Sequence, residues 1–383
     1  MNSRERVLTA INHQEPDRVP LDLGGAACCM FTKKFYLNLL DHLGMKDHMI
    51  FVADIPTQVV IANNKVLERL GTDVRLGMAP FRKAKGDIQK TWEDEKNRYY
   101  IDSWGVEYRM PKDPGLYYDM TGHPMKDTEA EEDVNIHWPD FPRFSPTLTR
   151  LHNKKIHTSG YFNAFSHYYS LGVYESGPRL YGFEDWLTML ALEPERVTAY
   201  LTEMVDRKIE WWKTMFEMAG DHIDMVCELD DLGTQRAPWI SPDMYKELIF
   251  PHHKRLYGAI KQMKPDVKIF HHSCGSIVPL IPYLIEAGVD VLNPVQTNAN
   301  GMDPVFLKKE FGKDITFWGG GIDTQYTLPH GTKQEIQDAV KRSIDILAPG
   351  GGFIFSPIHD IQPDVPVENF MIMQETFMEY AKY

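Results

Sequence analysis

The 383-residue chain has few cysteines, with only four at Cys28, Cys29, Cys227 and Cys274. Two of them are adjacent, which suits a disulfide framework poorly, so we expect four free thiols in a reducing compartment. No apolar run is long enough to span a bilayer. The first twenty residues, MNSRERVLTAINHQEPDRVP, lack the apolar core of a signal peptide. We therefore expect a cytoplasmic protein with no membrane-inserted part.

An excess of basic residues is also lacking. The chain has 41 Lys and Arg against 54 Asp and Glu, a formal net charge of −13, and its basic residues are scattered. This balance disfavours nucleic acid and polyanionic substrates, because both need compensating positive charge. Apolar residues make up 43% and charged residues 25%, which is typical of a globular protein with an ample core.

No internal repeat, low-complexity tract or flexible linker divides the chain, so we expect one domain over residues 1–383. The second half alternates short apolar strands with helices, which is typical of a parallel sheet. Eight such units would close a (βα)8 TIM barrel, and an open doubly wound sheet is the alternative. The expected strands are 18–24, 48–54, 155–165, 223–229, 266–272, 289–294, 314–320 and 352–357.

Residues 71 to about 150 do not show the strand–helix alternation of the second half of the chain. The stretch 88–110 alternates polar and aromatic residues around DEKN, a pattern typical of a β-hairpin. We therefore predict a β-rich insertion between the second and third barrel strands, lying over one mouth of the barrel.

The strongest chemical signal is a histidine and a cysteine at one predicted strand end. Barrel chemistry sits at the C-terminal ends of the strands, and His272 and Cys274 would share one face there. An imidazole and a thiolate make half of a tetrahedral zinc site. We expect His359 as a third ligand, and Glu228 or Asp231 as a fourth ligand or proton donor. The alternative is a buried thiol beside a hydrogen-bonded histidine.

Four further residues are candidates for substrate contact or catalysis. Asp54 and Trp318 end two other predicted strands. Tyr168 and Tyr169 follow the third predicted strand, where aromatic side chains would line an apolar pocket. We expect Trp318, Tyr168 and Tyr169 to contact the substrate.

Two other motifs are interpreted as structural. The glycines of WGGGID, residues 318–323, are expected to allow a tight turn, although they could also cradle a phosphate. His252 and His253 are adjacent within a predicted helix, so they point in different directions, and we expect both on the helix surface.

Almost the whole chain resembles the uroporphyrinogen decarboxylase superfamily, in particular its methyltransferase-like branch. The superfamily fold is a (βα)8 barrel, in agreement with the expected strands. The blocks that carry the resemblance are RERVLTAINHQEPDRVPLDLGG, FVADIP, DDLGTQRAPWISPDMYKELIFPHHKRL, FHHSCGSIVPLIPYLIEAGVDVLNPVQ and GGFIFSPIHDIQPDVPVENF.

The superfamily divides by chemistry. Its decarboxylases act on a porphyrinogen without a metal, and an arginine-containing N-terminal segment grips the substrate carboxylates. Its cobamide-dependent methyltransferases hold zinc with a His-x-Cys pair and a later Cys. Here the N-terminal segment LDLGGAACCM has no Arg or Lys, and His272 and Cys274 match the zinc pair. His359 stands where the later Cys would be, and Asp54 matches the catalytic aspartate of the decarboxylases.

The resemblance therefore implies a zinc-dependent methyltransferase that moves a methyl group between a small methylated substrate and a corrinoid protein. An aromatic methyl ether is one candidate substrate, and a homodimer is a family-level expectation. Two alternatives stay open. One is a metal-free decarboxylase, with Asp54 as polar anchor and His359 as proton donor. The other is a non-catalytic binding protein on the same barrel.

Overall fold

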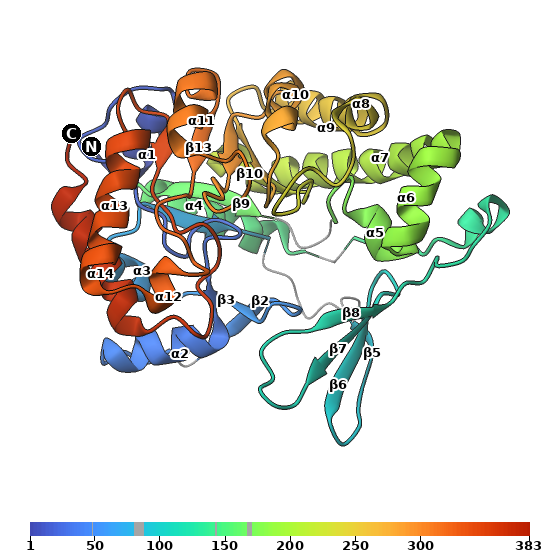
Figure 1. Ribbon diagram of the computed structural model, residues 1–383, viewed down its shortest axis with the longest axis horizontal. Helices are drawn as coiled ribbons and strands as arrows, with labels where there is room; N and C mark the ends of the chain where they lie inside the picture. The colour runs from blue at the N-terminus through green and yellow to red at the C-terminus, as the bar shows by residue number, and fades with distance from the viewer. Residues whose placement is uncertain (48, 80–87, 142–143, 167–170) are drawn as a thin grey trace.

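The computed structural model describes residues 1–47, 49–79, 88–141, 144–166 and 171–383, and it has an α/β fold with three sheets (Figure 1). The largest sheet is parallel and curled, with the strand order β14-β13-β12-β11-β10-β9-β4. Its strands are β4 (Val74–Gly77), β9 (Phe162–Ser166), β10 (Met225–Leu229), β11 (Lys268–His272), β12 (Val291–Asn293), β13 (Thr316–Trp318) and β14 (Phe353–Ile354).

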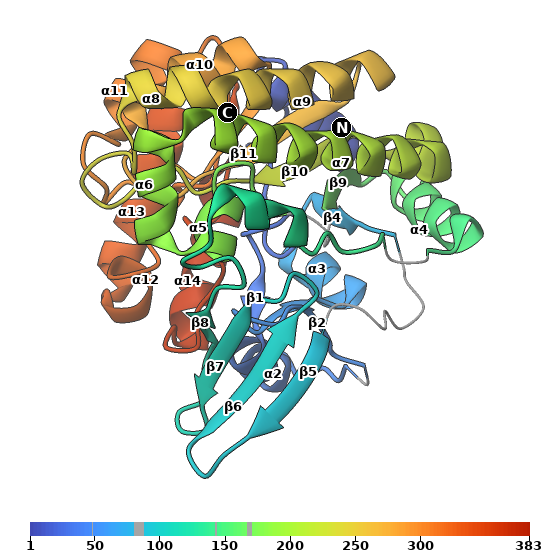
Figure 2. The same cartoon turned by 90° about the vertical axis from the view of Figure 1, so that its right-hand side faces the viewer.

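Helices surround this sheet and pack side by side, α4 on α7, α7 on α9, α9 on α10, α11 on α13 and α13 on α14 (Figures 1 and 2). The α-helices are α1 (Ser3–Ile11), α2 (Lys33–His42), α3 (Asn64–Leu70), α4 (Pro146–Thr158), α5 (Ser176–Tyr181), α6 (Phe183–Leu192), α7 (Pro194–Ala219), α8 (Pro242–Met244), α9 (Phe250–Met263), α10 (Ile281–Ala287), α11 (Pro304–Phe311), α12 (Thr327–His330), α13 (Lys333–Leu347) and α14 (Val367–Tyr380). Short turns are η1 (Ala130–Asn135), η2 (Gly220–His222), η4 (Val278–Leu280) and the π-helical η3 (Tyr245–Ile249). Within the described residues, none of these helices has the length and apolar character needed to cross a membrane.

Local sequence explains several helix boundaries. The Ser241 hydroxyl accepts a hydrogen bond from the Met244 backbone and so caps the start of the predicted helix that contains His252 and His253. That helix is interrupted by the π-helical turn η3, because Pro251 has no N–H with which to continue the α-helical ladder. Gly288 ends α10 at a φ of +101°, a conformation that favours glycine.

The second predicted strand was assigned to the wrong sheet. Residues 51–54 form β2, which pairs antiparallel with β3 (Val59–Ile61), and β3 pairs with β1 (Phe31–Thr32). β4 lies beside β9 in the parallel sheet, where the second predicted strand was expected. Its sequence, VRLG, contains a charged arginine, so it was not recognised as a buried strand. The Arg75 side chain is buried there, with its guanidinium 3.6 Å from the Tyr161 ring centre.

The predicted strand 18–24 forms only an isolated bridge, but it reaches both edges of the parallel sheet. Leu21 bridges Phe355 in parallel, directly after β14. The Leu21 carbonyl accepts a hydrogen bond from the Asp73 backbone, directly before β4. Six of the eight predicted strands thus lie in the parallel sheet, β4 is a seventh member that was not predicted, and the segment around Leu21 lies between the outermost two.

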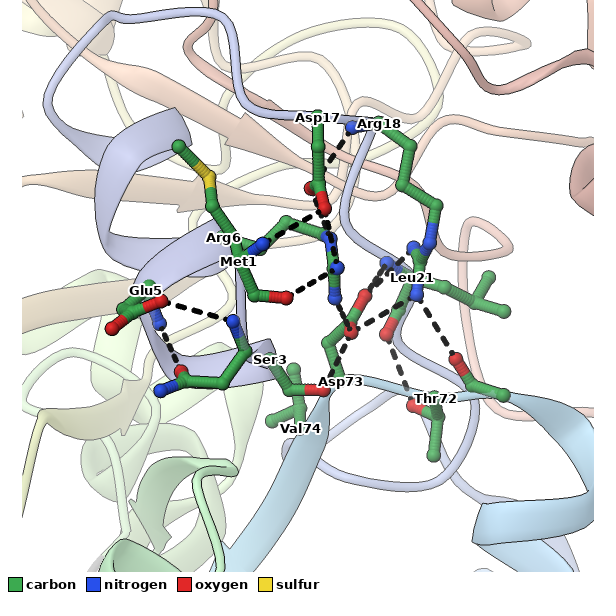
Figure 3. Close-up of polar contacts among 12 residues, drawn as sticks. Met1, Ser3, Glu5, Arg6, Asp17, Arg18, Leu21, Thr72, Asp73 and Val74 are labelled. Carbon is green, nitrogen blue, oxygen red and sulfur yellow. Dashed lines mark hydrogen bonds and ion pairs between the residues drawn. The ribbon is translucent and has the colours of Figure 1, made fainter.

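The buried carboxylate of Asp73 connects the Leu21 segment to the start of β4 (Figure 3). Asp73 accepts hydrogen bonds from the Leu21 backbone at 2.9 Å, from Ser3 at 2.7 Å and from Arg6 at 2.7 Å. Arg18 pairs with the same carboxylate at 2.8 Å. A buried charge needs such partners, so Asp73 ties α1 and the Leu21 segment to the foot of β4.

The predicted hairpin is confirmed as part of a separate antiparallel sheet with the order β5-β6-β7-β8, which projects from the rest of the molecule (Figures 1 and 2). Asp94 accepts hydrogen bonds from the backbone of Lys96 and Asn97 and so shapes the predicted turn. Tyr100 and Tyr108 stack 4.7 Å apart on neighbouring strands. The strands are β5 (Ile88–Glu93), β6 (Asn97–Asp102), β7 (Glu107–Pro111) and β8 (Asp119–Gly122).

Inside the curled sheet lies a small apolar core to which every parallel strand contributes. It is closed at one end by apolar residues of α1. The members from the strands are Val74, Phe162, Ala164, Met225, Cys227, Phe270, Val291, Trp318 and Ile354. The opposite end of the sheet, where the strands finish, is left for polar side chains.

Candidate metal centre

A cavity of about 400 Å³ opens where the parallel strands end. One wall consists of strand-end residues, among them Cys28, Asp231, His272 and His359. The other wall comes from the β2–β3 turn, from β6 and β7 and from α5. The cavity therefore lies between the parallel sheet and the antiparallel sheet.

The predicted pair of ligands meets at this strand end. The Cys274 sulfur lies 3.4 Å from His272 Nε2, and an Asp231 carboxylate oxygen lies 3.6 Å from the same nitrogen. Ligand atoms around a tetrahedral zinc ion are roughly 3.3–3.8 Å apart, from bonds of about 2.0–2.3 Å. The Cys274 backbone donates to Asp231 at 2.8 Å, which fixes the carboxylate beside the thiol. The three side chains thus have the spacing that a metal needs.

A second set of three shares the same histidine. Ligand atoms of Cys28, His272 and His359 lie within 4.8 Å of one another, as do those of Asp231, His272 and Cys274. The ring centres of His272 and His359 are 5.4 Å apart. These sets place His359 beside His272 and Cys28, so a single ligand set of His272, Cys274 and His359 stays a prediction, and Cys28 is an additional sulfur that we did not predict.

The turn that presents Cys28 is held firmly. The Asp22 carboxylate accepts hydrogen bonds from the Gly25 and Ala26 backbones at 2.8 and 3.1 Å. Cys28 itself has a φ of +58°, an uncommon conformation for a residue with a side chain. The sequence did carry a signal, because Cys28 comes shortly after the predicted strand 18–24, just as the other strand-end residues follow theirs.

The donor set suits zinc. Two sulfurs, two imidazoles and one carboxylate are the ligand types that zinc accepts. All four cysteines are free, as expected. Burial raises the pKa of the Cys28 and Cys274 thiols, and burial lowers the pKa of His272. A bound divalent cation would oppose the first effect, because it favours the thiolate, and a neutral imidazole is already the ligand form.

Glu228 does not lie in this cavity. It is buried on the other face of β10, where its carboxylate pairs with Lys208 at 2.7 Å and accepts from the Trp212 indole at 2.6 Å. The reason is the two-residue alternation of a strand, which turns Cys227 inward and Glu228 toward α7. The expectation of Glu228 as a ligand or proton donor is therefore withdrawn.

The other candidates divide between the cavity and the core. Asp54 lines the cavity and accepts from the Thr57 backbone at 2.9 Å. Trp318 lies in the core inside the sheet, fully buried, and its indole donates to Asp22 at 3.1 Å. Trp318 therefore has no place in the cavity wall. Tyr168 and Tyr169 lie outside the described residues.

Sequence reasoning missed the wall opposite the ligands. Tyr108 accepts a hydrogen bond from Arg179 at 3.2 Å, and Arg179 pairs with Glu175 at 2.5 Å. Burial raises the pKa of Tyr108, although the neighbouring Arg179 lowers it. Tyr100 and Trp104 line the same wall. The hairpin pattern gave the strands but did not show which of their faces turns toward the cavity.

The adjacent histidines of α9 are buried, so their expected surface position is wrong. His253 Nε2 lies 2.8 Å from the Asp230 carboxylate, and the Tyr245 hydroxyl lies 3.0 Å from His253 Nδ1. Asp230 also accepts from the backbones of Tyr174 and Glu175, both at 2.8 Å. This buried chain of hydrogen bonds holds the turn that leads into α5 and its cavity residues.

Comparisons with known proteins agree with this architecture. A family model described as uroporphyrinogen decarboxylase (URO-D) matches residues 174–380. A methyltransferase structure from Methanosarcina mazei superposes with a TM-score of 0.62 at 15% identity, covering 99% of both chains. At that identity the likeness concerns the fold alone.

Two curated relatives match parts of the chain. The methylated-thiol–coenzyme M methyltransferase of Methanosarcina mazei is 23% identical over 166 residues, which are 43% of this chain and 40% of that protein. The uroporphyrinogen decarboxylase of Geobacter metallireducens is 25% identical over 201 residues, which are 51% of this chain and 53% of that protein. The chain thus spans about half, or less, of the length of the curated relatives it matches.

Proposed function

The chain belongs to the uroporphyrinogen decarboxylase (URO-D) family, and we propose that it is a zinc-dependent methyltransferase. It would move a methyl group between a small methylated substrate and a corrinoid carried by a partner protein. The observation that carries this proposal is that two sets of ligand atoms, Cys28 with His359 and Cys274 with Asp231, converge on His272 at one end of the cavity.

The ligand spacing favours a metal over the alternative of a buried thiol beside a histidine. A structural thiol needs one partner, whereas here two three-residue sets come from four separate segments of the chain. Zinc, when bound, would act as a Lewis acid on the heteroatom that carries or receives the methyl group. His272 would hold it together with either Cys28 and His359 or Cys274 and Asp231, and three protein ligands would leave the fourth position for the heteroatom.

The rest of the cavity supports a small substrate. A volume of about 400 Å³ is near the lower end of the range for small-molecule sites. The Tyr100 and Trp104 side chains would contact an apolar or aromatic part of the substrate, and Tyr108 with Arg179 would orient a polar part. Asp54, at the cavity edge beside Thr57, is positioned to accept a proton from the substrate. An aromatic methyl ether fits these features, and Tyr168 and Tyr169 stay proposed contacts.

A decarboxylase of a porphyrinogen is less well supported. Such a substrate carries many carboxylates, which need free cationic side chains. Among the described cavity residues, Arg179 is the one Lys or Arg, and Glu175 already compensates its charge. The carboxylates of Asp54, Asp102, Asp231 and Asp360 add negative charge around the same cavity.

We also propose that the Leu21 segment serves as an eighth strand, so that residues 1–383 form one (βα)8 barrel. The Asp73 backbone donates a hydrogen bond to the Leu21 carbonyl, and Phe355 donates to the Pro20 carbonyl and accepts from the Asp22 backbone, and these bonds support this closure. The β-rich insertion would then begin after β4, later than the expected residue 71. A corrinoid partner would approach the cavity mouth.

Elemental analysis of protein purified without a histidine tag tests the metal. We expect about one zinc per chain, and loss of that zinc in Cys274→Ala. A parent protein that contains no zinc, and takes up none on titration, would overturn the proposal. Methyl transfer itself is then followed by the spectrum of a corrinoid mixed with candidate methyl donors.

A further inference from the structure

His272, the histidine that both ligand sets share, is hydrogen-bonded to the side-chain amide of Asn293. Asn293 ends β12 and stands directly across from His272 in the parallel register. Its side chain is fully buried, and its Oδ1 lies 2.5 Å from His272 Nδ1. This is the nitrogen of the ring that faces away from Cys274.

The orientation of that amide follows from its other neighbours. Asn293 Nδ2 lies 2.8 Å from the backbone carbonyl of Trp318 and 3.8 Å from the Cys29 sulfur. A carbonyl oxygen accepts hydrogen bonds and has none to donate, so the amide nitrogen must face Trp318. The reversed amide would place two oxygens against each other. Oδ1 is therefore the atom that faces His272.

This orientation determines the tautomer of the histidine. The Asn293 oxygen is an acceptor without a proton, so His272 Nδ1 must carry the proton of their hydrogen bond. The lone pair of the neutral ring then lies on Nε2, which faces the Cys274 sulfur at 3.4 Å and Asp231 at 3.6 Å. That lone pair is what a metal would bind.

The glycine run WGGGID contributes to the same arrangement. A Cβ atom at Gly319 would lie 3.1 Å from Asn293 Nδ2, so a side chain there would crowd the amide. Gly319 also has a φ of +95°, which favours glycine. The tight-turn interpretation of this motif is supported, and the turn leaves room for the amide beside the Trp318 carbonyl.

We propose that Asn293 is a positioning residue that selects the metal-binding tautomer of His272. The Trp318 carbonyl orients Asn293, and Asn293 orients His272, across the ends of three neighbouring strands. The proposal rests on the proposed function for its metal, but the tautomer is a property of the metal-free protein. Partners of this kind typically change metal affinity 10- to 100-fold when they are removed.

Nitrogen-15 NMR of histidine-labelled, metal-free protein tests the tautomer directly. We expect His272, identified by the signals lost in His272→Gln, to carry its proton on Nδ1. In Asn293→Ala the proton should distribute between both nitrogens. Asn293→Asp keeps an acceptor at this position, so it should retain the Nδ1 proton. A parent spectrum with the proton on Nε2 would overturn the proposal, even if Asn293→Ala fails to fold.

Zinc affinity, measured by competition with a chromophoric chelator, tests the consequence. We expect Asn293→Ala to weaken zinc binding 10- to 100-fold and Asn293→Asp to restore most of it. Asn163→Ala is the matched control, because Asn163 is an equally buried amide that bonds to Asn153 and to the His222 carbonyl. Unchanged affinity in Asn293→Ala would contradict the proposal. A parent protein that binds no zinc would overturn the proposed function and leave the NMR result to decide the tautomer.

Discussion

Glu228 and Asp231 lie three residues apart in sequence, yet their carboxylates face different parts of the molecule. Glu228 pairs with Lys208 beneath α7, whereas Asp231 lines the cavity and accepts a hydrogen bond from the Cys274 backbone. The two residues therefore form a natural pair for separating stability from metal binding.

Asp231→Asn should weaken zinc binding about tenfold, because an amide oxygen is a poorer zinc ligand than a carboxylate, and it should change stability little. Glu228→Gln should leave zinc affinity unchanged and lower the free energy of unfolding by about 3 kcal/mol, because Lys208 loses its counterion in a buried place. Chelator competition and urea denaturation measure the two quantities. The same change in zinc affinity for both variants would contradict the assignment of the two carboxylates.

Cys28→Ser should weaken zinc binding at least tenfold, since a thiolate ligand would be lost from one of the two sets. Cys227→Ser is the matched control, because Cys227 is a thiol of the core inside the sheet. The control should lower stability through a buried hydroxyl and leave zinc affinity unchanged. If Cys28→Ser binds zinc like the parent, the centre relies on Cys274 for its sulfur.

Asp22 should give a defined pH dependence to stability. Burial raises the pKa of its carboxyl to about 6 in the folded protein, above the value of about 4 for an unfolded chain. The folded state therefore holds this proton more tightly, and the stabilising contribution is lost as pH rises from about 4 to about 6. The loss amounts to roughly 3 kcal/mol.

The test compares the stability of the parent protein with that of Asp22→Asn at each pH, because other groups also titrate in this window. Urea midpoints of the metal-free proteins are compared between pH 4 and pH 6.5, so that zinc release does not contribute. The parent should lose stability relative to the variant as pH rises. A constant difference across the window would contradict the raised pKa.

Asp73→Ala should be among the most destabilising substitutions, costing about 3–5 kcal/mol, because Arg6 and Arg18 would lose a buried partner. Asp17→Ala is the control, since Asp17 also pairs with Arg6 but its side chain is 43% exposed. The control should cost less than about 1 kcal/mol. Similar urea midpoints for the two variants would show that Asp73 does not connect the Leu21 segment to the start of β4.

Tyr108→Phe should impair substrate use without affecting the metal. The variant keeps the ring in the cavity wall and removes the hydroxyl that accepts from Arg179. We expect kcat/KM for methyl transfer to fall about tenfold, as for the loss of one hydrogen bond to a charged group. Zinc content should stay that of the parent, and a loss of zinc would place Tyr108 in the structure of the centre.

The sequence supported local inferences well. Short apolar strands that alternate with helices predicted the second half of the parallel sheet. Ser241 and Gly288 mark helix ends through their own local chemistry, a hydroxyl cap and a positive φ. His272 and Cys274 were recognisable because both sit on one strand end, so no long-range folding was needed to bring them together.

Relationships across the fold were harder to predict. Cys28 reaches His272 only because the Leu21 segment lies between the two edge strands, a contact between distant parts of the chain. Glu228 was placed at the cavity because a continuous apolar strand does not show in its sequence which of its two faces points inward, and the alternation of β10 turns Glu228 toward α7. His253 looked like a surface residue because its buried partner Asp230 comes from another element.

The antiparallel sheet β5–β8 has a consequence for how this protein could diversify. It supplies Tyr100, Trp104 and Tyr108 to one side of the cavity, while the residues suited to hold an ion come from the opposite side. Mutations in these outlying strands can therefore alter which molecule is accepted without touching the reactive end. Relatives with the same sulfur and imidazole groups but a different outlying sheet should accept different compounds through a common chemistry.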